Sequence, residues 1–269
     1  MSRLLERSVP DDYLLRMASD WIRRHLPLGA WKNDMLVAVV RLEDLGEKEG
    51  WCGGLRVAPE LRMQGLGRAL MEYLMTVARL RGISVLRDLI EEDNTPSRML
   101  AKAIGFRELL MASHLAGTIT PARGAAPAVP VTILPEIGID EMSWVRALGG
   151  HMSPTGPERF RFVRATRERL SKEMEGGTLF STPQGTGLFL FSKPVKVGWS
   201  ERTLRSFAPL NGPLVEIIDA AASLMEGDGS RVDGFLPVDL AALGVAEKRG
   251  WIPGEMWGRR VLLCERRLF

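Results

Sequence analysis

The sequence predicts an α/β protein built from two tandem copies of one unit. Three observations lead to this class. Strand and helix patterns alternate between residues 34 and 115, a segment rich in Gly, Ala and Pro lies near the middle, and several glycines recur after a shift of 145 residues. The length of 269 residues also suggests two domains of ordinary size. Hydrophobic residues make up 45% and charged residues 26%, the balance of a globular protein with a hydrophobic core.

The first elements are a helix and a hairpin. Residues 11–26 have a helical pattern, and the expected inner face carries Leu14, Met17, Trp21 and Ile22. Residues 34–42 are rich in β-branched side chains, residues 46–50 form a turn, and residues 51–57 continue as a strand. This order predicts a β-hairpin over 34–57.

A glycine-led helix follows the hairpin. Residues 66–80 carry apolar side chains at intervals of three and four, and Gly82 ends the helix. The expected inner positions are Leu66, Ala69, Leu70, Tyr73, Leu74, Val77 and Ala78. A strand is predicted over 83–90. A short helix over 94–106 follows, with Thr95 as its cap, Pro96 in its first turn and Gly105 at its end. A last strand is predicted over 106–115.

The second half repeats several of these signals. A shift of 145 residues places Gly67 on Gly212, Gly82 on Gly227, Gly105 on Gly250, Phe106 on Trp251 and Asn94 on Asp239. The same shift places Arg62 on Phe207 and Gly65 on Leu210, so the second copy has lost both. We therefore expect one domain over 1–118, a linker over 119–130 and a degenerate copy over 131–269.

Composition bears on location and partners. No apolar run approaches the ~20 residues of a membrane span, and the N-terminus is charged. Cys52 and Cys264 are the only cysteines, which favours reduced thiols and a cytoplasmic protein. The net charge is +3, but basic residues are scattered among 33 acidic ones, so we expect neither a nucleic-acid nor a membrane partner. No Cys/His spacing supports a metal site.

The stretch "PELRMQGLGRALMEYL" (59–74) places two glycines between a strand and a helix. Glycines let consecutive backbone N–H groups turn toward one point, and a helix N-terminus adds positive dipole character. This arrangement predicts a phosphate cradle, with Arg62 and Arg68 beside it. A nucleotide P-loop would need a lysine and a hydroxyl after the second glycine, and a dinucleotide fingerprint would need a glycine where Leu70 stands.

"LRVAPELRMQGLGRALM" resembles the acyl-CoA-binding segment of the GNAT family of N-acetyltransferases, whose Arg/Gln-x-x-Gly-x-Gly/Ala pattern falls on Arg62, Gly65 and Gly67. A second family segment is similar at Asn94, Gly105 and Phe106. The resemblance covers about residues 50–110 and implies an α+β fold in each half, with a mixed, mostly antiparallel sheet flanked by helices. It also implies acetyl-CoA as acyl donor, bound by Leu55, Arg56, Val57, Arg62, Met63, Gln64, Gly65, Leu66, Gly67, Arg68, Asn94 and Lys102.

The catalytic groups are not identified by the sequence. The family's tyrosine acid would stand at Ala101, and its acidic residue on the central strand would fall near Gly53 or Gly54, so both are missing. We interpret Tyr73 as a core aromatic. Glu91 and Glu92 are weak candidates for a base acting through water, and the alternative is a solvated strand end.

The remaining reactive side chains are interpreted as structural. The three histidines, His25, His114 and His151, are scattered along the chain. Cys52 is interpreted as a small buried residue.

The expected function is therefore transfer of an acetyl group from acetyl-CoA to an amine of an unidentified acceptor. The alternative is a non-catalytic acyl-CoA-binding or regulatory module. About 50 residues precede the motif strand, few for the family, so the first domain could lack its opening strand or borrow an edge from the second domain or a partner chain. A homodimer is one form that such borrowing would take.

Overall fold

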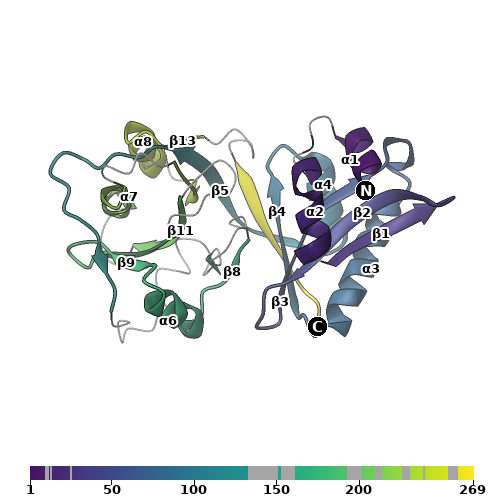
Figure 1. Ribbon diagram of the computed structural model, residues 1–269, viewed down its shortest axis with the longest axis horizontal. Helices are drawn as coiled ribbons and strands as arrows, with labels where there is room; N and C mark the ends of the chain where they lie inside the picture. The colour runs from purple at the N-terminus through teal and green to yellow at the C-terminus, as the bar shows by residue number, and fades with distance from the viewer. Residues whose placement is uncertain are drawn as a thin grey trace. The chain divides into compact units, whose positions relative to one another are not determined.

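The chain folds into two compact units. Unit 1 contains Met1–Glu108 and Cys264–Phe269, and unit 2 contains Leu109–Leu263. The computed structural model describes residues 1–9, 12, 14–24, 26–132, 151–152, 161–192, 202–209, 214–225, 231–238, 240–253 and 260–269 (Figure 1). The domain bounds of 1–118 and 131–269 were expected from the sequence repeat, and they stay a prediction.

Two helices open unit 1. α1 spans Ser2–Ser8 and α2 spans Leu14–Arg24. The sequence predicted only the second, because α1 is a single short segment with few apolar positions. Its Leu4 and Leu5 are buried in one cluster with Leu14 and Trp21. Packing of this kind stabilises helices that are too short to be stable alone.

The predicted inner face of α2 is partly right. Leu14 and Trp21 are each 1% exposed, so both lie in the core as expected. The prediction is wrong at Ile22, which is 57% exposed. The side chain of Met17 lies outside the described residues.

The sheet of unit 1 begins with β1 (Leu26–Lys32), which the sequence analysis missed. This strand contains Pro27 and Gly29, two residue types that are depleted in strands but tolerated at a sheet edge. β1 pairs antiparallel with β2 (Met35–Asp44), and β2 pairs antiparallel with β3 (Glu49–Val57). The hairpin over 34–57 is confirmed, and the idea that the opening strand is missing is wrong.

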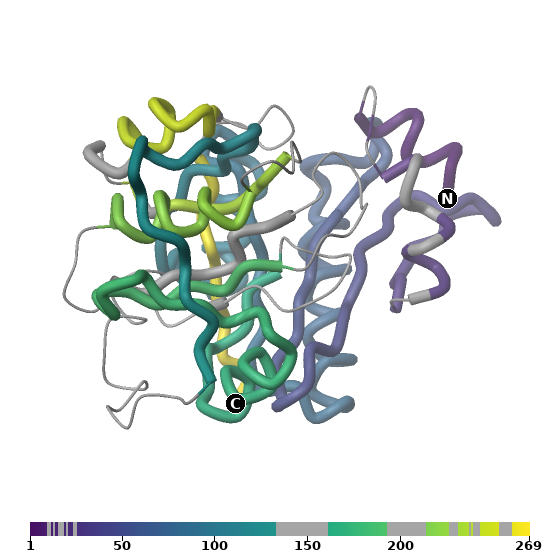
Figure 2. Tube along the Cα trace, turned by 60° about the vertical axis from the view of Figure 1, so that its left-hand side comes forward, coloured from purple at the N-terminus to yellow at the C-terminus, as the bar shows by residue number. Residues whose placement is uncertain are grey.

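β3 runs parallel to β4 (Val85–Glu91), and α3 (Leu66–Leu80) connects them. The 3-10 helix η1 (Pro59–Leu61) lies in the same connection, and α4 (Thr95–Ala103) follows β4. Figure 1 and Figure 2 show α1 and α2 on one face of this sheet and α3 on the other. The helix over 66–80 is confirmed to the residue.

The buried face of α3 differs from the predicted one. Its buried residues are Leu70, Met71, Leu74, Met75 and Ala78. Tyr73 is 57% exposed, so its interpretation as a core aromatic is wrong. Two methionines fill the space instead, because the buried stripe is rotated by about one residue from the predicted one.

The last six residues of the chain belong to unit 1. They include the end of β14 (Val261–Arg267), which lies next to β4 in the sheet order. Arg87 on β4 donates from Nε to Glu265 (2.9 Å) and from Nη2 to Glu49 (3.1 Å). Leu268 donates its N–H to Ser84 O at 2.8 Å. Unit 1 thus includes a strand segment from the C-terminal end of the sequence. This segment lies beside β4, whereas β1 is the opening strand.

The described strands of unit 2 follow one another in the sheet in the order β5-β12-β11-β10-β9-β6, with β13 also on β5. β11 and β12 pair in parallel, whereas the other described pairs of this sheet are antiparallel. β7 and β8 form a separate two-stranded sheet.

The strands are β5 (Arg107–Gly117), β6 (Val129–Pro130), β7 (His151–Met152), β8 (Val163–Arg164), β9 (Leu179–Ser181), β10 (Gly187–Phe191), β11 (Arg202–Pro209), β12 (Val232–Pro237) and β13 (Ile252–Pro253). Its helices are α6 (Arg167–Glu175), α7 (Leu214–Ser223) and α8 (Leu240–Lys248). β5 enters this unit at Leu109. Both units therefore have mixed, mostly antiparallel sheets with flanking helices.

Arg87→Met is expected to lower the free energy of unfolding by about 3–5 kcal/mol, because it removes the buried ion-pair partner of one buried and one partly buried carboxylate. The side chain of Arg87 is 3% exposed, and those of Glu49 and Glu265 are 8% and 16% exposed. Urea denaturation measures the change. The control is Lys172→Met, which removes an exposed i,i+4 ion pair with Glu168 and should leave the midpoint unchanged. Equal urea midpoints for the two variants would contradict a stabilising role for the ion pairs of Arg87 with Glu49 and Glu265.

Candidate functional site

β3 and β4 separate along their length. Their parallel ladder consists of three pairs, Glu49↔Val85, Gly50↔Leu86 and Trp51↔Arg87. β3 continues to Val57 and β4 to Glu91 without pairing to each other, although both strands lie in the described part of the chain. Beyond these pairs the facing edges of β3 and β4 are not paired with each other, and we call the space between these edges the opening.

A β-bulge at Gly54 sits where the separation begins. Val39 pairs with Arg56 and Arg41 pairs with Gly53, so two residues of β2 lie opposite three residues of β3. The extra residue on β3 shifts the register between these two pairs. Gly54 has φ +65°, and a Cβ there would lie 2.1 Å from the Trp21 ring. Only glycine combines this backbone conformation with such close packing. The bulge thus lies directly against α2.

Main-chain groups at the end of β3 point into the opening. Ala58 donates its N–H to Val37 O on β2 (2.8 Å), so by strand alternation Arg56 also faces β2. Leu55 and Val57 then face away from β2. Their carbonyls accept side-chain hydrogen bonds instead, from Arg56 Nη1 (3.2 Å) and Arg62 Nε (3.2 Å). Their N–H groups point to the side that β4 has left.

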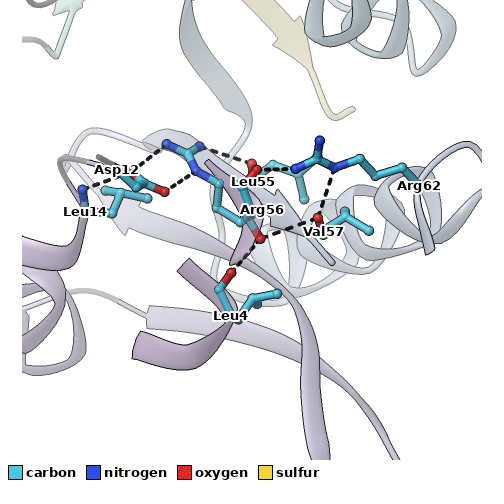
Figure 3. A network of polar contacts seen from close by, with 8 residues as sticks. Leu4, Asp12, Leu14, Leu55, Arg56, Val57 and Arg62 are labelled. Carbon is cyan, nitrogen blue, oxygen red and sulfur yellow. Dashed lines mark hydrogen bonds and ion pairs between the residues drawn. The ribbon is translucent and has the colours of Figure 1, made fainter. Parts of the chain in front are cut away.

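Two arginines fix this strand end (Figure 3). Arg56 donates to the buried carboxylate of Asp12 through Nε (2.6 Å) and Nη2 (3.0 Å), and Asp12 also accepts the N–H of Leu14 (3.0 Å). Arg62 binds Val57 O and also Ser8 O. Both arginines were expected at the cofactor, and in this structure their hydrogen bonds tie α1 and α2 to β3.

The loop between β3 and α3 presents a run of backbone donors. Met63 has φ +57° and is 97% exposed, and Gly65 has φ +81° as the N-cap of α3. In the described part of the chain, no acceptor is hydrogen-bonded to the N–H groups of residues 63–68, whereas Ala69 N–H bonds Gly65 O. Six consecutive unbonded donors at a helix N-terminus are an arrangement that suits an anion, and the phosphate cradle itself stays a prediction.

The other predicted cradle residues occupy supporting positions. Gln64 Nε2 donates to Glu60 O (2.9 Å), and Arg68 Nε pairs with Glu72 (2.8 Å) on the exposed side of α3. Leu66 is partly buried. A Cβ on Gly67 would lie 3.4 Å from Leu55, which places the start of α3 against β3. Main-chain groups, and not arginine side chains, therefore dominate the inner surface of the loop.

Asn94, and not Thr95, caps α4. Its Oδ1 accepts the N–H of Ser97 at 3.2 Å, so the expectation that Thr95 caps the helix and leaves the Asn94 side chain free is wrong. An Asn side chain satisfies a helix N-terminus better than Thr. Lys102 is exposed in the last turn, and Ala101, at the position of the family's tyrosine, is buried.

The two expected carboxylates end β4. Burial raises the pKa of Glu91 above its ordinary value, the negative charge of Asp93 adds to the rise, and Arg56 opposes it. Glu92 is partly buried, and its carbonyl accepts from Arg98 Nη1 (2.9 Å).

The remaining reactive side chains are structural where they are described. Cys52 is fully buried, its thiol contacts Arg87 O at 3.5 Å, and burial raises its pKa well above the ordinary value. Burial lowers the pKa of His114 to about 4. His25 and Tyr13 lie outside the described residues, as does the His151 side chain.

The described residues contain no group of three His, Cys, Asp or Glu that could hold a metal ion. No helix in the described part of the chain is long and apolar enough to cross a membrane.

Comparison with known proteins gives a family match in unit 1. Residues 3–106 match the model of the acetyltransferase (GNAT) family. The activity that this class implies is acyl transfer from an acyl-CoA. Comparison of the sequence with curated proteins gives no match.

Solved structures share the fold over the whole chain. A proposed acetyltransferase from Thermoplasma acidophilum has a TM-score of 0.58 at 16% identity, and the alignment covers 99% of this chain and 88% of that one. A GCN5-related N-acetyltransferase from Sphaerobacter thermophilus has a TM-score of 0.56 at 15% identity, covering 99% and 91%. At these identities the similarity concerns the fold alone.

Gly54→Ala is expected to destabilise the protein by about 1–3 kcal/mol more than Gly46→Ala does, because only the first substitution makes a methyl group overlap the Trp21 ring. The two glycines have similar φ values, +65° and +76°, and a Cβ on Gly46 would have no atom within 4 Å. The pair separates steric contact from backbone strain. Equal urea midpoints for the two variants would show that Trp21 does not hold the bulge.

Proposed function

We propose that this protein is an N-acetyltransferase that moves an acetyl group from acetyl-CoA to an amine of an acceptor. The observation that carries the proposal is the run of unbonded N–H groups at residues 63–68, placed at the end of a strand that has left its neighbour. The cofactor that fits is an anion joined to an extended arm with amide groups. Acetyl-CoA has both parts.

The diphosphate of acetyl-CoA would bind the cradle. Successive N–H groups at a helix N-terminus supply hydrogen bonds and positive potential without a counter-charge from side chains. Arg62 and Arg68 lie at either end of the loop and would add charge at its rim. In this proposal the main role of Arg62 is to hold the loop in place through its hydrogen bonds to Val57 O and Ser8 O.

The pantetheine arm would lie along β3. The N–H groups of Leu55 and Val57 face the opening and can bond the arm as a neighbouring strand would. One of them would donate to the thioester oxygen as negative charge develops there. Asn94 Oδ1 caps α4, so its amide nitrogen would contact the arm, and Lys102 would lie near the outer phosphate.

Deprotonation of the acceptor needs a base. Of the two expected candidates, Glu91 suits this role better than Glu92, since its raised pKa brings proton exchange closer to neutral pH. Ala101 cannot replace the family's tyrosine as an acid, so the departing thiolate would take its proton from another group or from water.

Unit 2 would be a degenerate copy of the same fold. β11 and β12 pair in parallel over three residues only, and β10–β11 has a register shift next to the end of this ladder, as β2–β3 does in unit 1. α8 starts and ends 145 residues after α4, and Gly250 repeats the positive φ of Gly105. Leu210, Gly212, Gly227 and Asp239 lie outside the described residues.

The second copy lacks two residues of the cradle. A shift of 145 residues places Phe207 on Arg62 and Leu210 on Gly65. Because leucine rarely takes the positive φ that Gly65 has, unit 2 is expected to bind no acetyl-CoA. Titration calorimetry would then give one site per chain.

A cytoplasmic enzyme is proposed from the two free thiols. A homodimer stays a proposal as well. The non-catalytic alternative is not favoured by the family match.

Gly65→Glu is expected to weaken acetyl-CoA binding by about 100-fold, because it places a carboxylate and a strained backbone in the cradle and so removes roughly two charge-assisted hydrogen bonds to the diphosphate. Gly82→Glu is the matched control. Gly82 ends the same helix, has φ +77° against +81°, and both positions are open. Calorimetry with acetyl-CoA measures both. Unchanged affinity in Gly65→Glu would refute the cradle.

Thiol release from acetyl-CoA across a panel of primary amines tests the activity. We expect at least one amine to raise the rate above the hydrolysis background. Acetyl-CoA binding without turnover of any amine would instead support the non-catalytic module, and no binding would refute both.

A further inference from the structure

The side chain of Arg56 lies on the face of β3 that α1 and α2 cover, which we call the helix side of β3 (Figure 1). A Cβ on Gly67 of α3 would lie 3.4 Å from the Leu55 side chain and 3.6 Å from that of Val57, so both side chains face α3. Successive side chains of a strand alternate between its two faces. The Arg56 side chain therefore lies on the opposite face, where it reaches Asp12 ahead of α2 (Figure 3).

The ion pair between Arg56 and Asp12 is buried and bidentate. Arg56 donates from Nε at 2.6 Å and from Nη2 at 3.0 Å. The side chain of Asp12 is 0% exposed and that of Arg56 is 17% exposed. Two parallel charge-assisted hydrogen bonds fix a guanidinium more firmly than a single contact does. Arg56 is therefore held on the helix side of β3.

A second carboxylate lies within electrostatic reach of Arg56. Burial raises the pKa of Glu91 at the end of β4, and the charge of Arg56 opposes this rise. The positions of the two residues along the strands agree with this. Arg56 lies five residues beyond Trp51, Glu91 lies four residues beyond Arg87, and Trp51↔Arg87 is the last β3–β4 pair. Because the bulge gives β3 one extra residue, Arg56 and Glu91 lie at the same level of the opening.

The charge of Asp12 decides where Arg56 can turn. Without it, a poorly hydrated guanidinium would remain beside Glu91, and such a cation gains free energy by pairing with an adjacent carboxylate. An Arg56–Glu91 ion pair would connect β3 to β4 across the opening, toward which the N–H groups of Leu55 and Val57 point. It would occupy the space that the pantetheine arm needs.

We infer that Asp12 is a positioning residue whose carboxylate keeps Arg56 from crossing the opening to Glu91. This role rests on the proposed binding of acetyl-CoA along β3. It deepens that proposal, because it assigns to the segment before α2 the task of keeping the opening clear for the arm. Asp12 acts through Arg56 and needs no contact with the cofactor.

The test is titration calorimetry with acetyl-CoA. Asp12→Asn is expected to weaken binding by about tenfold, the equivalent of about one hydrogen bond between the arm and β3. The asparagine still offers an oxygen to the N–H of Leu14, so the hydrogen bond at the start of α2 is kept. Asp12→Glu retains the charge and should recover most of the affinity.

The substitution Glu91→Gln separates this role from a purely structural one. In the Asp12→Asn background it removes the second carboxylate, so acetyl-CoA binding should return to within about threefold of the wild type. This gain should exceed, by about threefold or more, any gain that Glu91→Gln gives in the wild-type background. A structural loss at Asp12 would not respond to Glu91.

The matched control is Glu60→Gln. It removes the exposed ion pair between Arg7 and Glu60 (2.8 Å), which also joins α1 to the segment after β3. The Kd for acetyl-CoA should stay within about twofold. Urea denaturation checks that each variant folds. If Asp12→Asn does not fold, Arg56→Lys takes its place. It keeps both charges but loses the bidentate pair, so it should weaken binding by about threefold, again reversed by Glu91→Gln.

Unchanged affinity in Asp12→Asn, or a loss that Glu91→Gln does not reverse, would overturn the inference and leave the proposed function standing. The same two outcomes in Arg56→Lys would overturn it where that variant is used. Absence of acetyl-CoA binding in the wild type would refute the proposed function, and this role of Asp12 with it.

Discussion

The site depends on one constraint, the separation of β3 from β4. Three pairs of residues hold the strands together, and Gly54 then takes a conformation that a side chain would not tolerate against Trp21. From that point the N–H groups of Leu55 and Val57 have no neighbouring strand to bond. Unpaired main-chain groups are costly when buried, so a fold that keeps them must hold them for a ligand or for water. The loop over 63–68, with its unbonded N–H groups, follows the end of this strand.

Much of unit 1 could be predicted from the sequence because its signals are local. The 3.6-residue period located α3, and the positive-φ glycines marked its two ends. The period did not fix which side of the helix is buried. Tyr73 and Met75 both fit an amphipathic helix, yet Tyr73 is 57% exposed and Met75 is 3% exposed. The sequence did not predict β1, because Pro27 and Gly29 are residue types that argue against a strand. An edge strand tolerates both.

The main-chain conformation of the loop over 62–68 could be inferred from residue types, because glycine positions encode main-chain conformation. The separation of β3 from β4 could not be inferred in this way, because it depends on the pairing of two strands more than thirty residues apart. The adjacent Gly53 and Gly54 within a strand were the available signal, since glycine inside a strand often marks a bulge or a close approach. In the sequence alone they indicated only the loss of an acidic residue.

The C-terminal strand of unit 1 has a consequence for biosynthesis. A ribosome must add the 155 residues of unit 2 after Glu108 before Cys264–Phe269 can be made. At about 5–20 residues per second this takes roughly 8–30 s. During that interval the nascent N-terminal part has β4 with an open edge and Arg87 without Glu265. Completion of unit 1 is thereby coupled to translation of the given chain as far as its last strand.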